Sequence, residues 1–343
     1  MPNHFRCNFR QKSVDNMEPN ELLQILEAIG SYIPSSTAKG EVADISLYDH
    51  MKLTAALAIC LYDYLHSKGI NDYKSYCYGA KQKDLRKENT YLLVSGDISG
   101  IQDFIYTIPS KGALKSLRGR SFYLELLMEN VIDELLERLD LNRCNLIYNG
   151  GGNFYLLLPN TSQVLTELEN VQNIINQWFW EKFGTRLYIA IGWAPCAAND
   201  FMVNSGNALG SIYSKARSMI AVQKHRRYNA HQLGQLFQLH SQINTVKDGA
   251  RECSICHTSS TNLSLYGDAE ETWACDMCCS LRNLGEELLK YDVLVVLDKM
   301  PEAKQKCVEL PSLQGKRYLM AIAEKEVSQL SNIKRIYVKN LIY

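Results

Sequence analysis

The 343-residue sequence has no excess of charge of either sign, because 37 lysines and arginines are matched by 37 aspartates and glutamates. A neutral chain is not drawn to nucleic acid by its overall field, so such contacts must come from local basic patches. The longest apolar run, LTAALAICL at residues 53–61, is far too short to cross a bilayer. The opening residues, MPNHFRCNFR, have no apolar signal-peptide core. We therefore expect a cytoplasmic protein without membrane contact.

The sequence also lacks the spacing of a disulfide framework. Eleven cysteines is an odd number, and six of them are scattered along the chain: Cys7, Cys60, Cys77, Cys144, Cys196 and Cys307. Reduced thiols of this kind are typical of the cytosol. The other five cysteines lie together at residues 253–279.

That cluster contains two CxxC pairs, Cys253 with Cys256 and Cys275 with Cys278, separated by 18 residues. Two such turns present four thiolates that close a tetrahedral zinc site of the zinc-ribbon type. A redox pair or disulfides are the alternatives, and replacing a ligand by Cys279 or His257 would not preserve both turns. Because four protein ligands leave no open position, we predict a structural zinc ion rather than a catalytic one.

A second pattern lies at residues 91–125, which begin YLLVSGDISGIQDFIY. A short apolar strand ends at Asp97 and passes through Ser99 and Gly100 into a short helix, and α/β folds often hold ligands at such a junction. Basic residues follow, and Ser121 is a candidate N-cap for a second helix, a combination that suits a phosphate. The basic residues are Lys111, Lys115, Arg118 and Arg120. Alternatively, the glycines only form the turn and the basic side chains are only solvated.

The following residues predict the fold. A strand, a Gly-rich turn at residues 150–153 and a second strand indicate a hairpin, and a helix and an apolar strand at 187–193 follow. The order βαββαβ is that of a ferredoxin-like α+β domain, which is also the palm of many nucleotide polymerases and cyclases. Two-metal chemistry needs carboxylates from the first strand and from the hairpin turn, but the turn carries Asn153. This palm should therefore not catalyse nucleotidyl transfer by itself.

At this level of detail the sequence resembles the large subunit of type III-A CRISPR effector complexes, the Csm complex. The similarity rests on long motifs in the order of that family: DISLYDH (44–50), GDISGIQDFIY (96–106), KSLRGRSFYLELL (115–127), GGGNFYLLLP (150–159) and the two CxxC pairs. The family has an HD nuclease domain that cuts single-stranded DNA, a first palm, a zinc-bearing linker domain, and a second palm. The GGDD motif of that second palm makes cyclic oligoadenylates from ATP with Mg²⁺ or Mn²⁺, and a helical domain follows.

The resemblance implies four regions here: a helical remnant of an HD domain at 1–75, the first palm at 90–240, the zinc-binding linker domain at 245–290, and the truncated start of a second palm at 291–343. It implies that one wall of an ATP site is formed by Asp97, Ser99, Gly100, Gly151, Gly152 and Asn153. The implied partners are other Csm subunits, above all the one that holds the 5′ end of the CRISPR RNA, and through the complex the CRISPR RNA and target RNA.

The sequence departs from the family at both ends, because it contains neither a His-Asp dipeptide nor GGDD. The DISLYDH motif would make Asp49 a late member of the HD metal cluster, but His4 is the only histidine upstream of it. Asp49 is then a helix-terminal acid beside a surface His50. We expect no nuclease activity and no oligoadenylate synthesis from this chain alone, which looks like the N-terminal to middle portion of the family's large subunit.

A helix predicted at residues 208–228 carries Lys215, Arg217, Lys224, Arg226 and Arg227 and no acid. It is either a solvated face or a contact for phosphates of RNA or ATP, with nearby tyrosines available for stacking. Three functions follow from these patterns. The leading one is a scaffold portion of the Csm large subunit that takes part in antiviral defence. The others are an autonomous HD-type phosphohydrolase or nucleotide cyclase, and a zinc-ribbon nucleic-acid adaptor.

Overall fold

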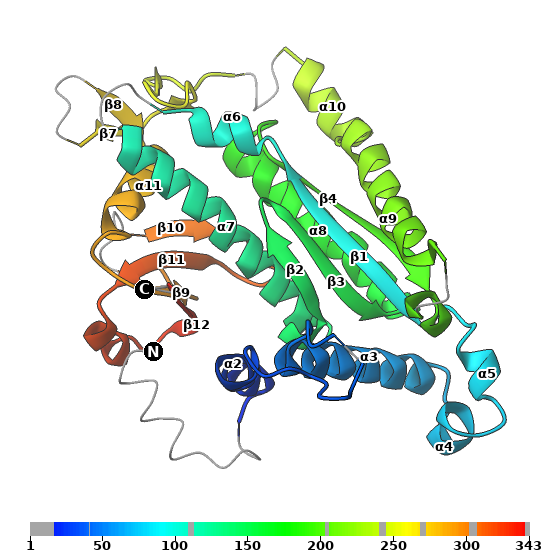
Figure 1. Ribbon diagram of the computed structural model, residues 1–343. Coiled ribbons are helices and arrows are strands. Elements are labelled where there is room, and N and C mark those ends of the chain that lie inside the picture. Colours follow the sequence, from blue (N-terminus) through cyan, green and yellow to red (C-terminus); the bar gives the residue numbers. More distant parts are fainter. Residues whose placement is uncertain are drawn as a thin grey trace.

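The computed structural model of the protein describes residues 17–40, 42–108, 113–202, 206–239, 245–267, 272–301 and 307–339 (Figure 1). His4, Cys7 and Lys111 lie outside these ranges. Within them, no helix combines the length and the apolar character needed to cross a membrane.

The first sheet has four strands in the spatial order β2-β3-β1-β4, and each neighbouring pair is antiparallel. The order along the chain, strand-helix-strand-strand-helix-strand, is the one predicted for a ferredoxin-like domain. Its elements are β1 (Tyr91–Ser99), α7 (Ala113–Arg138), β2 (Leu146–Gly150), β3 (Asn153–Pro159), α8 (Ser162–Phe183) and β4 (Tyr188–Cys196). A short helix, α6 (Ile101–Tyr106), lies between β1 and α7.

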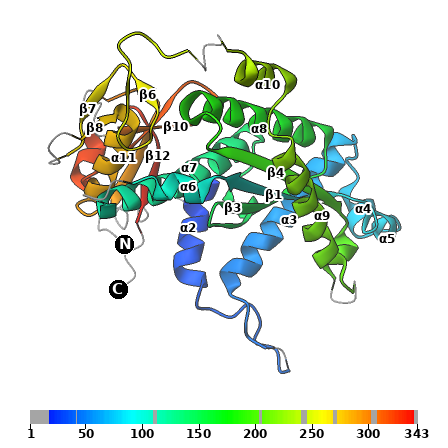
Figure 2. The ribbon, with the colours of Figure 1, turned by 90° about the horizontal axis from the view of Figure 1, so that it is seen from above.

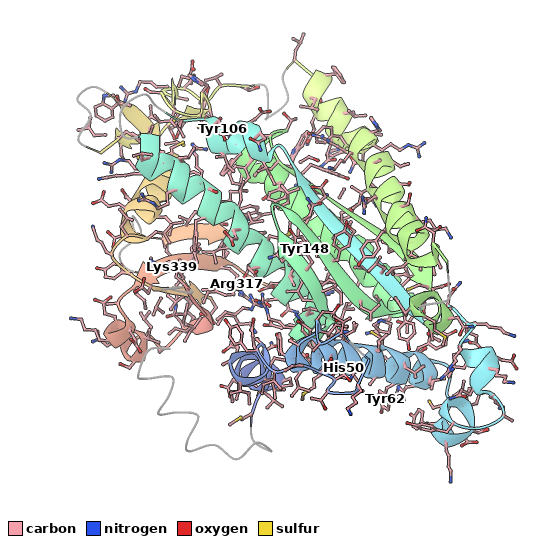
Figure 3. The ribbon with its side chains drawn as sticks, in the orientation of Figure 1. His50, Tyr62, Tyr106, Tyr148, Arg317 and Lys339 are labelled. Carbon is pink, nitrogen blue, oxygen red and sulfur yellow. The ribbon has the colours of Figure 1, made fainter. Side chains whose placement is uncertain are left out.

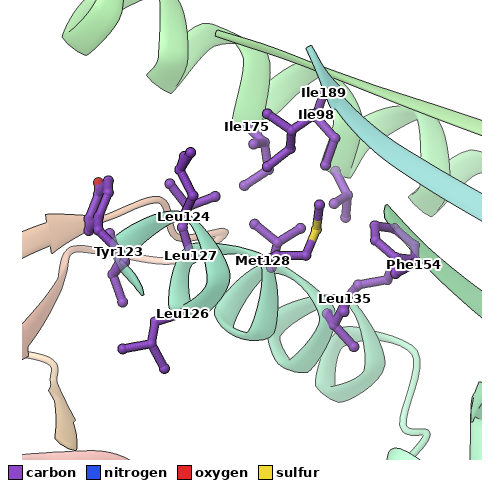
Figure 4. Packing of buried hydrophobic residues seen from close by; sticks show 14 of the residues in the cluster. Ile98, Tyr123, Leu124, Leu126, Leu127, Met128, Leu135, Phe154, Ile175 and Ile189 are labelled. Atoms are coloured by element: carbon purple, nitrogen blue, oxygen red, sulfur yellow. The ribbon is translucent and has the colours of Figure 1, made fainter. Parts of the chain in front are cut away.

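Helices cover both faces of this sheet, which explains why the first four residues of β1 are all apolar. Successive side chains of a strand point to opposite faces. Leu92 and Val94 belong to the core shared with α7 and α8, whereas Tyr91 and Leu93 belong to a second core shared with α3 (Leu47–Ser67) and α9 (Ala208–His225). Figure 4 shows residues of the first core, with those of α7 beside those of the sheet and α8: Leu124, Leu127, Met128, Leu135, Ile98, Phe154, Ile175 and Ile189.

The hairpin between β2 and β3 turns where predicted. Gly150 pairs with Asn153, and the two residues between them, Gly151 and Gly152, have φ angles of 61° and 84°. Two consecutive positive φ angles define the tight turn that suits the twist of a hairpin, and glycine adopts them without steric cost. The amide of Ile98 donates to the carbonyl of Gly152 at 3.0 Å, so the turn is fixed to the end of β1.

The N-terminal region is helical, as predicted, with α2 (Pro19–Gly30) and α3 followed by α4 (Tyr73–Cys77) and α5 (Gln82–Leu85). Residues 76–90 are mostly polar and charged, but α5 lies within them and Leu85 is buried beside Tyr64 and Leu65 of α3. A single buried apolar residue gives little signal in a segment whose other residues are mostly polar and charged.

The helix predicted at 208–228 is shorter than expected. Helix α9 ends at His225, and a separate helix, α10 (Ala230–Phe237), follows after a turn. Asn229 caps α10, since its side chain accepts a hydrogen bond from the amide of Gln232. This break before Asn229 was not predicted.

The cysteine cluster lies in a module of two short hairpins and one helix. The hairpins are β5 (Arg251–Glu252) with β6 (Ser259–Ser260) and β7 (Leu263–Leu265) with β8 (Trp273–Cys275), and the helix is α11 (Asp276–Glu287). Figure 2 shows this module at one end of the molecule, with α4, α5 and α9 at the other end. Residues 251–287 are called the cysteine module below.

A second antiparallel sheet follows in the spatial order β10-β11-β9-β12. Its strands are β9 (Val293–Leu297), β10 (Cys307–Leu310), β11 (Arg317–Ile322) and β12 (Ile333–Val338). In the described residues no α-helix separates these strands, so the order of the first sheet is not repeated here. The assignment of this region to a second palm stays a prediction. Helix α7 lies between the two sheets, and one apolar cluster contains residues of all three (Figure 1).

Candidate metal centre and nucleotide wall

The four predicted metal ligands lie together. The sulfur atoms of Cys253, Cys256, Cys275 and Cys278 are all within 4.8 Å of one another, and those of Cys256 and Cys275 are 3.7 Å apart. Zinc–sulfur bonds of about 2.3 Å place two ligands of a tetrahedral ion about 3.8 Å apart. The donor set and its spacing therefore fit a zinc ion held by protein ligands alone.

Local structure presents each pair of cysteines. Cys253 and Cys256 lie in the turn from β5 to β6, which is closed by a hydrogen bond from the His257 amide to the Cys253 carbonyl at 3.0 Å. Cys275 ends β8 and is the N-cap residue of α11, so Cys278 falls in the first helical turn. The alternative ligands do not join the cluster. The His257 ring contacts Glu252, and the Cys279 thiol points to the carbonyl of Ala274.

The sulfurs share protons unevenly. A hydrogen bond from Cys278 lowers the pKa of Cys253 to about 5, whereas a hydrogen bond with Cys256 raises the pKa of Cys275 to about 12. Crowded thiols cannot all be deprotonated unless a cation offsets their mutual repulsion. A divalent ion would supply that charge.

The six residues predicted for the nucleotide wall lie at one end of the first sheet. Asp97 of β1 is the register partner of Asn153 of β3, and Ser99 and Gly100 follow at the end of the same strand. Gly151 and Gly152 form the adjoining turn. The Ser99 hydroxyl is buried and has no hydrogen-bond partner among the described residues. Sequence order thus predicted a real spatial cluster, and its role in nucleotide binding stays a prediction.

Two of these glycines are required by close contacts. Gly100 has a φ of 91°, and a Cβ atom there would lie 1.8 Å from the carbonyl oxygen of Arg186. Gly152 has a φ of 84°, and its Cβ atom would lie 2.0 Å from the side chain of Ile101. Both positions disfavour larger residues, so this edge of the sheet lies close against α6 and against the connection between α8 and β4.

The carboxylate of Asp97 is engaged by an ion pair with Lys224 of α9. Lys224 was predicted to lie in a basic helix, but its pairing with Asp97 was not predicted. Two residues after Asn153 on β3, the ring of Tyr155 meets the ring of Tyr213 of α9 edge-on, with 5.0 Å between centroids. Of the other basic residues, Lys215, Arg217 and Arg226 are exposed. The helix is therefore partly a solvated face and partly the cover of this wall.

The predicted phosphate site around Ser121 is wrong. Helix α7 begins at Ala113, so Ser121 lies in its interior and caps no helix. Arg118 donates to the carbonyl of Gly285 at 2.9 Å, Lys115 pairs with Glu286 at 2.9 Å, and Arg120 is buried beside Cys278. The basic motif thus joins α7 to the cysteine module. The partners of these basic residues lie far along the chain. The spacing of residues within the motif does not reveal such partners.

The structure places Asp49 at the start of α3. The Ser46 hydroxyl accepts from the Asp49 amide at 3.0 Å and donates to its carboxylate at 2.7 Å. His50, which Figure 3 labels on α3, is exposed. Among the ranges that the structure describes, the cysteines form the single cluster of metal-ligating residues. Asp49 therefore acts as a helix-terminal acid.

Comparison with known proteins finds similar sequences. Residues 90–242 match the family model described as Csm1 subunit domain B. The chain is 40% identical over 332 residues to the CRISPR system single-strand-specific deoxyribonuclease Cas10/Csm1 (subtype III-A) of Mycobacterium tuberculosis (strain ATCC 25618 / H37Rv), which covers 94% of this chain and 40% of that protein. The same-named protein of Streptococcus thermophilus is 39% identical over 336 residues, or 97% of this chain and 40% of its own length. Over almost its whole length, the chain is thus similar to part of these two Cas10/Csm1 proteins.

Solved structures of Cas10/Csm1 relatives agree with this similarity. The apo Csm1-Csm4 cassette has a TM-score of 0.63 at 28% identity, covering 90% of this chain and 34% of the matched chain. A Csm1-Csm4 cassette in complex with one ATP has a TM-score of 0.62 at 28% identity, covering 89% and 34%. The chain thus spans about 40% of the length of the curated Cas10/Csm1 relatives that it matches.

Proposed function

We propose that this chain is a binding and scaffolding portion of a type III-A CRISPR large subunit. It contributes a non-catalytic palm, one wall of an ATP site and a structural zinc centre to RNA-guided antiviral defence. Its partners are other Csm subunits, above all the one that holds the 5′ end of the CRISPR RNA, and through them the CRISPR RNA and target RNA. The relatives include a Csm1-Csm4 cassette in complex with one ATP, which supports this choice of partner and ligand.

One observation carries the non-catalytic part of the proposal. Asp97 is the carboxylate at the end of β1, and it is paired with Lys224 while its cross-strand neighbour is Asn153. A two-metal site needs carboxylates at both positions to hold Mg²⁺ or Mn²⁺. The ammonium group of Lys224 occupies the carboxylate of Asp97, which a two-metal site would use to bind Mg²⁺ or Mn²⁺. The wall can therefore contact a nucleotide but does not bind the two catalytic metal ions.

The ATP wall itself is supported by the tight turn at Gly151 and Gly152 and by the free hydroxyl of Ser99. The tyrosines beside the wall offer π faces for a base. Because only one wall is supplied by this chain, ATP binding by the isolated protein should be weak. Calorimetric titration with ATP should show no binding tighter than about a micromolar dissociation constant, which is about −8 kcal/mol.

The decisive experiment is an activity assay. The purified chain is incubated with ATP and Mg²⁺ or Mn²⁺, and separately with labelled single-stranded DNA, and the products are analysed by mass spectrometry and gel. We expect neither cyclic oligoadenylate nor cut DNA. A product that disappears in Asp97→Ala, or cleavage that disappears in Asp49→Ala, would favour the autonomous cyclase or the HD-type phosphohydrolase instead.

A further inference from the structure

Arg120 of α7 is a buried cation next to the predicted metal centre. It is 2% exposed, and one of its terminal nitrogens donates to the sulfur of Cys278 at 3.2 Å. The other donates to the carbonyl of Phe104 in α6 at 3.0 Å, and the guanidinium also lies over the Phe104 ring, 5.0 Å from its centroid. One side chain thus connects a metal ligand to the helix that follows the nucleotide wall.

The charge of Arg120 needs a counter-charge. A buried guanidinium is costly unless it is paired, and among the described residues no carboxylate lies within ion-pair distance of Arg120. Four thiolates around one Zn²⁺ have a net charge of about two negative units. The metal-thiolate group is therefore the anion that balances Arg120, and Cys278 is the sulfur in contact with it.

A second arginine makes the corresponding connection from the other CxxC turn. The side chain of Arg186 donates to the carbonyl of Cys256 at 3.5 Å and to the hydroxyl of Thr258 at 3.1 Å. The backbone carbonyl of the same residue lies against Gly100, where it leaves no room for a Cβ atom. Each CxxC turn is thus connected through one arginine to the segment 100–106.

The space between the cysteine module and segment 100–106 is not completely filled by side chains. A cavity of about 60 Å³ is lined by Phe104, Arg120, Arg186, Cys256 and Cys278, among others. Because apolar packing is incomplete here, the polar contacts of the two arginines largely fix the position of segment 100–106 relative to the cysteine module.

We propose that Arg120 is a positioning residue that balances the charge of the zinc-thiolate centre, and that Arg120 and Arg186 together make the bound metal set the position of segment 100–106. This inference rests on the proposed zinc centre and on the proposed nucleotide wall. It assigns the zinc a role beyond holding the cysteine module together, because metal loading then controls the geometry of Gly100 at the edge of the wall.

The first test measures zinc affinity by competition with a colorimetric chelator. Partners that contact a metal ligand typically change metal affinity 10–100-fold when they are lost. We expect Arg120→Met to weaken zinc binding by about 10-fold or more, and Arg120→Lys, which keeps the charge, to weaken it much less. Arg118→Met is the matched control, since Arg118 lies on the same helix and binds the Gly285 carbonyl rather than a sulfur. Its zinc affinity should change much less than that of Arg120→Met.

The second test measures amide hydrogen exchange of residues 97–108 in zinc-loaded protein. Arg120→Lys should expose these amides even though zinc stays bound, because its single ammonium nitrogen replaces the two terminal nitrogens with which the guanidinium reaches Cys278 and Phe104 separately. Arg186→Met should do the same without loss of zinc affinity, since Arg186 contacts a carbonyl and a hydroxyl. Exchange in α3 reports global unfolding and should not change in any variant that is folded.

The outcomes separate the two proposals. If the unmodified protein holds no zinc, the proposed function fails in that respect. If zinc binds but Arg120→Met and Arg118→Met have equal affinity, the counter-charge role of Arg120 is wrong. If zinc removal by a chelator raises exchange within residues 251–279 but leaves residues 97–108 unchanged, the connection to the wall is wrong.

Discussion

The two halves of helix α7 dock their neighbours by different means. In its first half, glycines allow the backbones of α7 and α11 to approach closely. Cβ atoms at Gly119 and Gly285 would lie 1.8 and 1.9 Å from carbonyl oxygens of the facing helix. Its second half meets the second sheet through charges. Glu134 accepts hydrogen bonds from Arg317 at 3.0 Å and from Arg335 at 3.3 Å, and it is 6% exposed. Arg317 is labelled between the second sheet and α7 in Figure 3.

We call the contact of α7 with α11 the first joint and its contact with the second sheet the second joint. The two joints depend on different interactions. Close approach of two helix backbones depends on shape, and in this case also on a cysteine module for which we propose a structural metal. A buried ion-pair network depends on every partner being present, because each charge left unpaired costs far more than the pair contributes. The first joint should therefore respond to metal removal and to added volume, and the second to charge removal and to acid.

The largest expected effect is on the joint that depends on the metal. Cys253→Ser or Cys275→Ser should lose zinc and unfold residues 251–287, because binding of structural zinc supplies about 10–16 kcal/mol in small zinc-binding peptides. Metal analysis should find one zinc in the unmodified protein and close to none in the variants. Cys279→Ser is the matched control, since that adjacent thiol lies outside the cluster, and it should retain the metal. Less than about half an equivalent of zinc in the unmodified protein would contradict the site.

The next effect is on the charged joint. Glu134→Gln removes the charge that faces Arg317 and Arg335, and breaking a buried pair from one side typically costs about 3–5 kcal/mol. We expect a loss of about 3 kcal/mol in the free energy of unfolding by urea. Asp84→Asn removes an exposed partner of Lys87, at 3.9 Å, and should change stability by less than about 0.5 kcal/mol. Equal effects of the two substitutions would show that the network adds nothing to docking.

The sequence predicted the first of these joints only in part. The two CxxC pairs were sufficient to predict the cluster of four cysteines, because the two cysteines of each pair are close in sequence. The βαββαβ order was sufficient for the first sheet, since alternating and helical apolar patterns are local signals. The residues of the nucleotide wall came together because β1 and the hairpin turn are neighbours in that sheet.

Contacts between distant segments could not be predicted. Arg118 and Arg120 have the composition of a phosphate site, but their partners, Gly285 and Cys278, lie more than 150 residues along the chain. Lys224 likewise finds Asp97 across 127 residues. A basic side chain has the same local sequence signal whether it meets a ligand, water or a distant carbonyl, so only the tertiary structure distinguishes these cases.

A smaller effect tests the shape of the first joint. Gly119→Ala introduces a methyl group against the Leu281 carbonyl, and overpacking of this kind typically costs about 1–3 kcal/mol. We expect a lower melting temperature and faster release of zinc to a chelator. Gly234→Ala, in α10, is the matched control, because no atom lies within 4 Å of its Cβ position. That substitution should stabilise the protein by up to about 1 kcal/mol, since alanine favours a helix. If Gly119→Ala changed neither the melting temperature nor the rate of zinc release, the two helices would be able to move apart at little cost.

The smallest expected effect concerns acid and the rim of the charged joint. Burial alone would raise the pKa of Glu137, but the hydrogen bond from Lys334 and the charge of Arg335 outweigh it, so the pKa lies below its ordinary value of 4.5. A carboxyl group with a lowered pKa stabilises the fold fully above its unfolded pKa and loses that contribution as the pH falls through the folded value.

Glu137→Gln should therefore lower the free energy of unfolding at pH 7, by less than about 1 kcal/mol because the side chain is half exposed. The difference from the unmodified protein should shrink steadily below pH 4.5, where the unmodified carboxyl group also becomes protonated. Urea unfolding of both proteins at a series of pH values measures this. Glu125→Gln replaces an exposed acid on the same helix; it is the matched control and should leave the free energy of unfolding at pH 7 nearly unchanged. A Glu137→Gln deficit that is the same at pH 7 and at pH 3 would mean that shape, not charge, carries this contact, and would remove the distinction drawn between the two halves of α7.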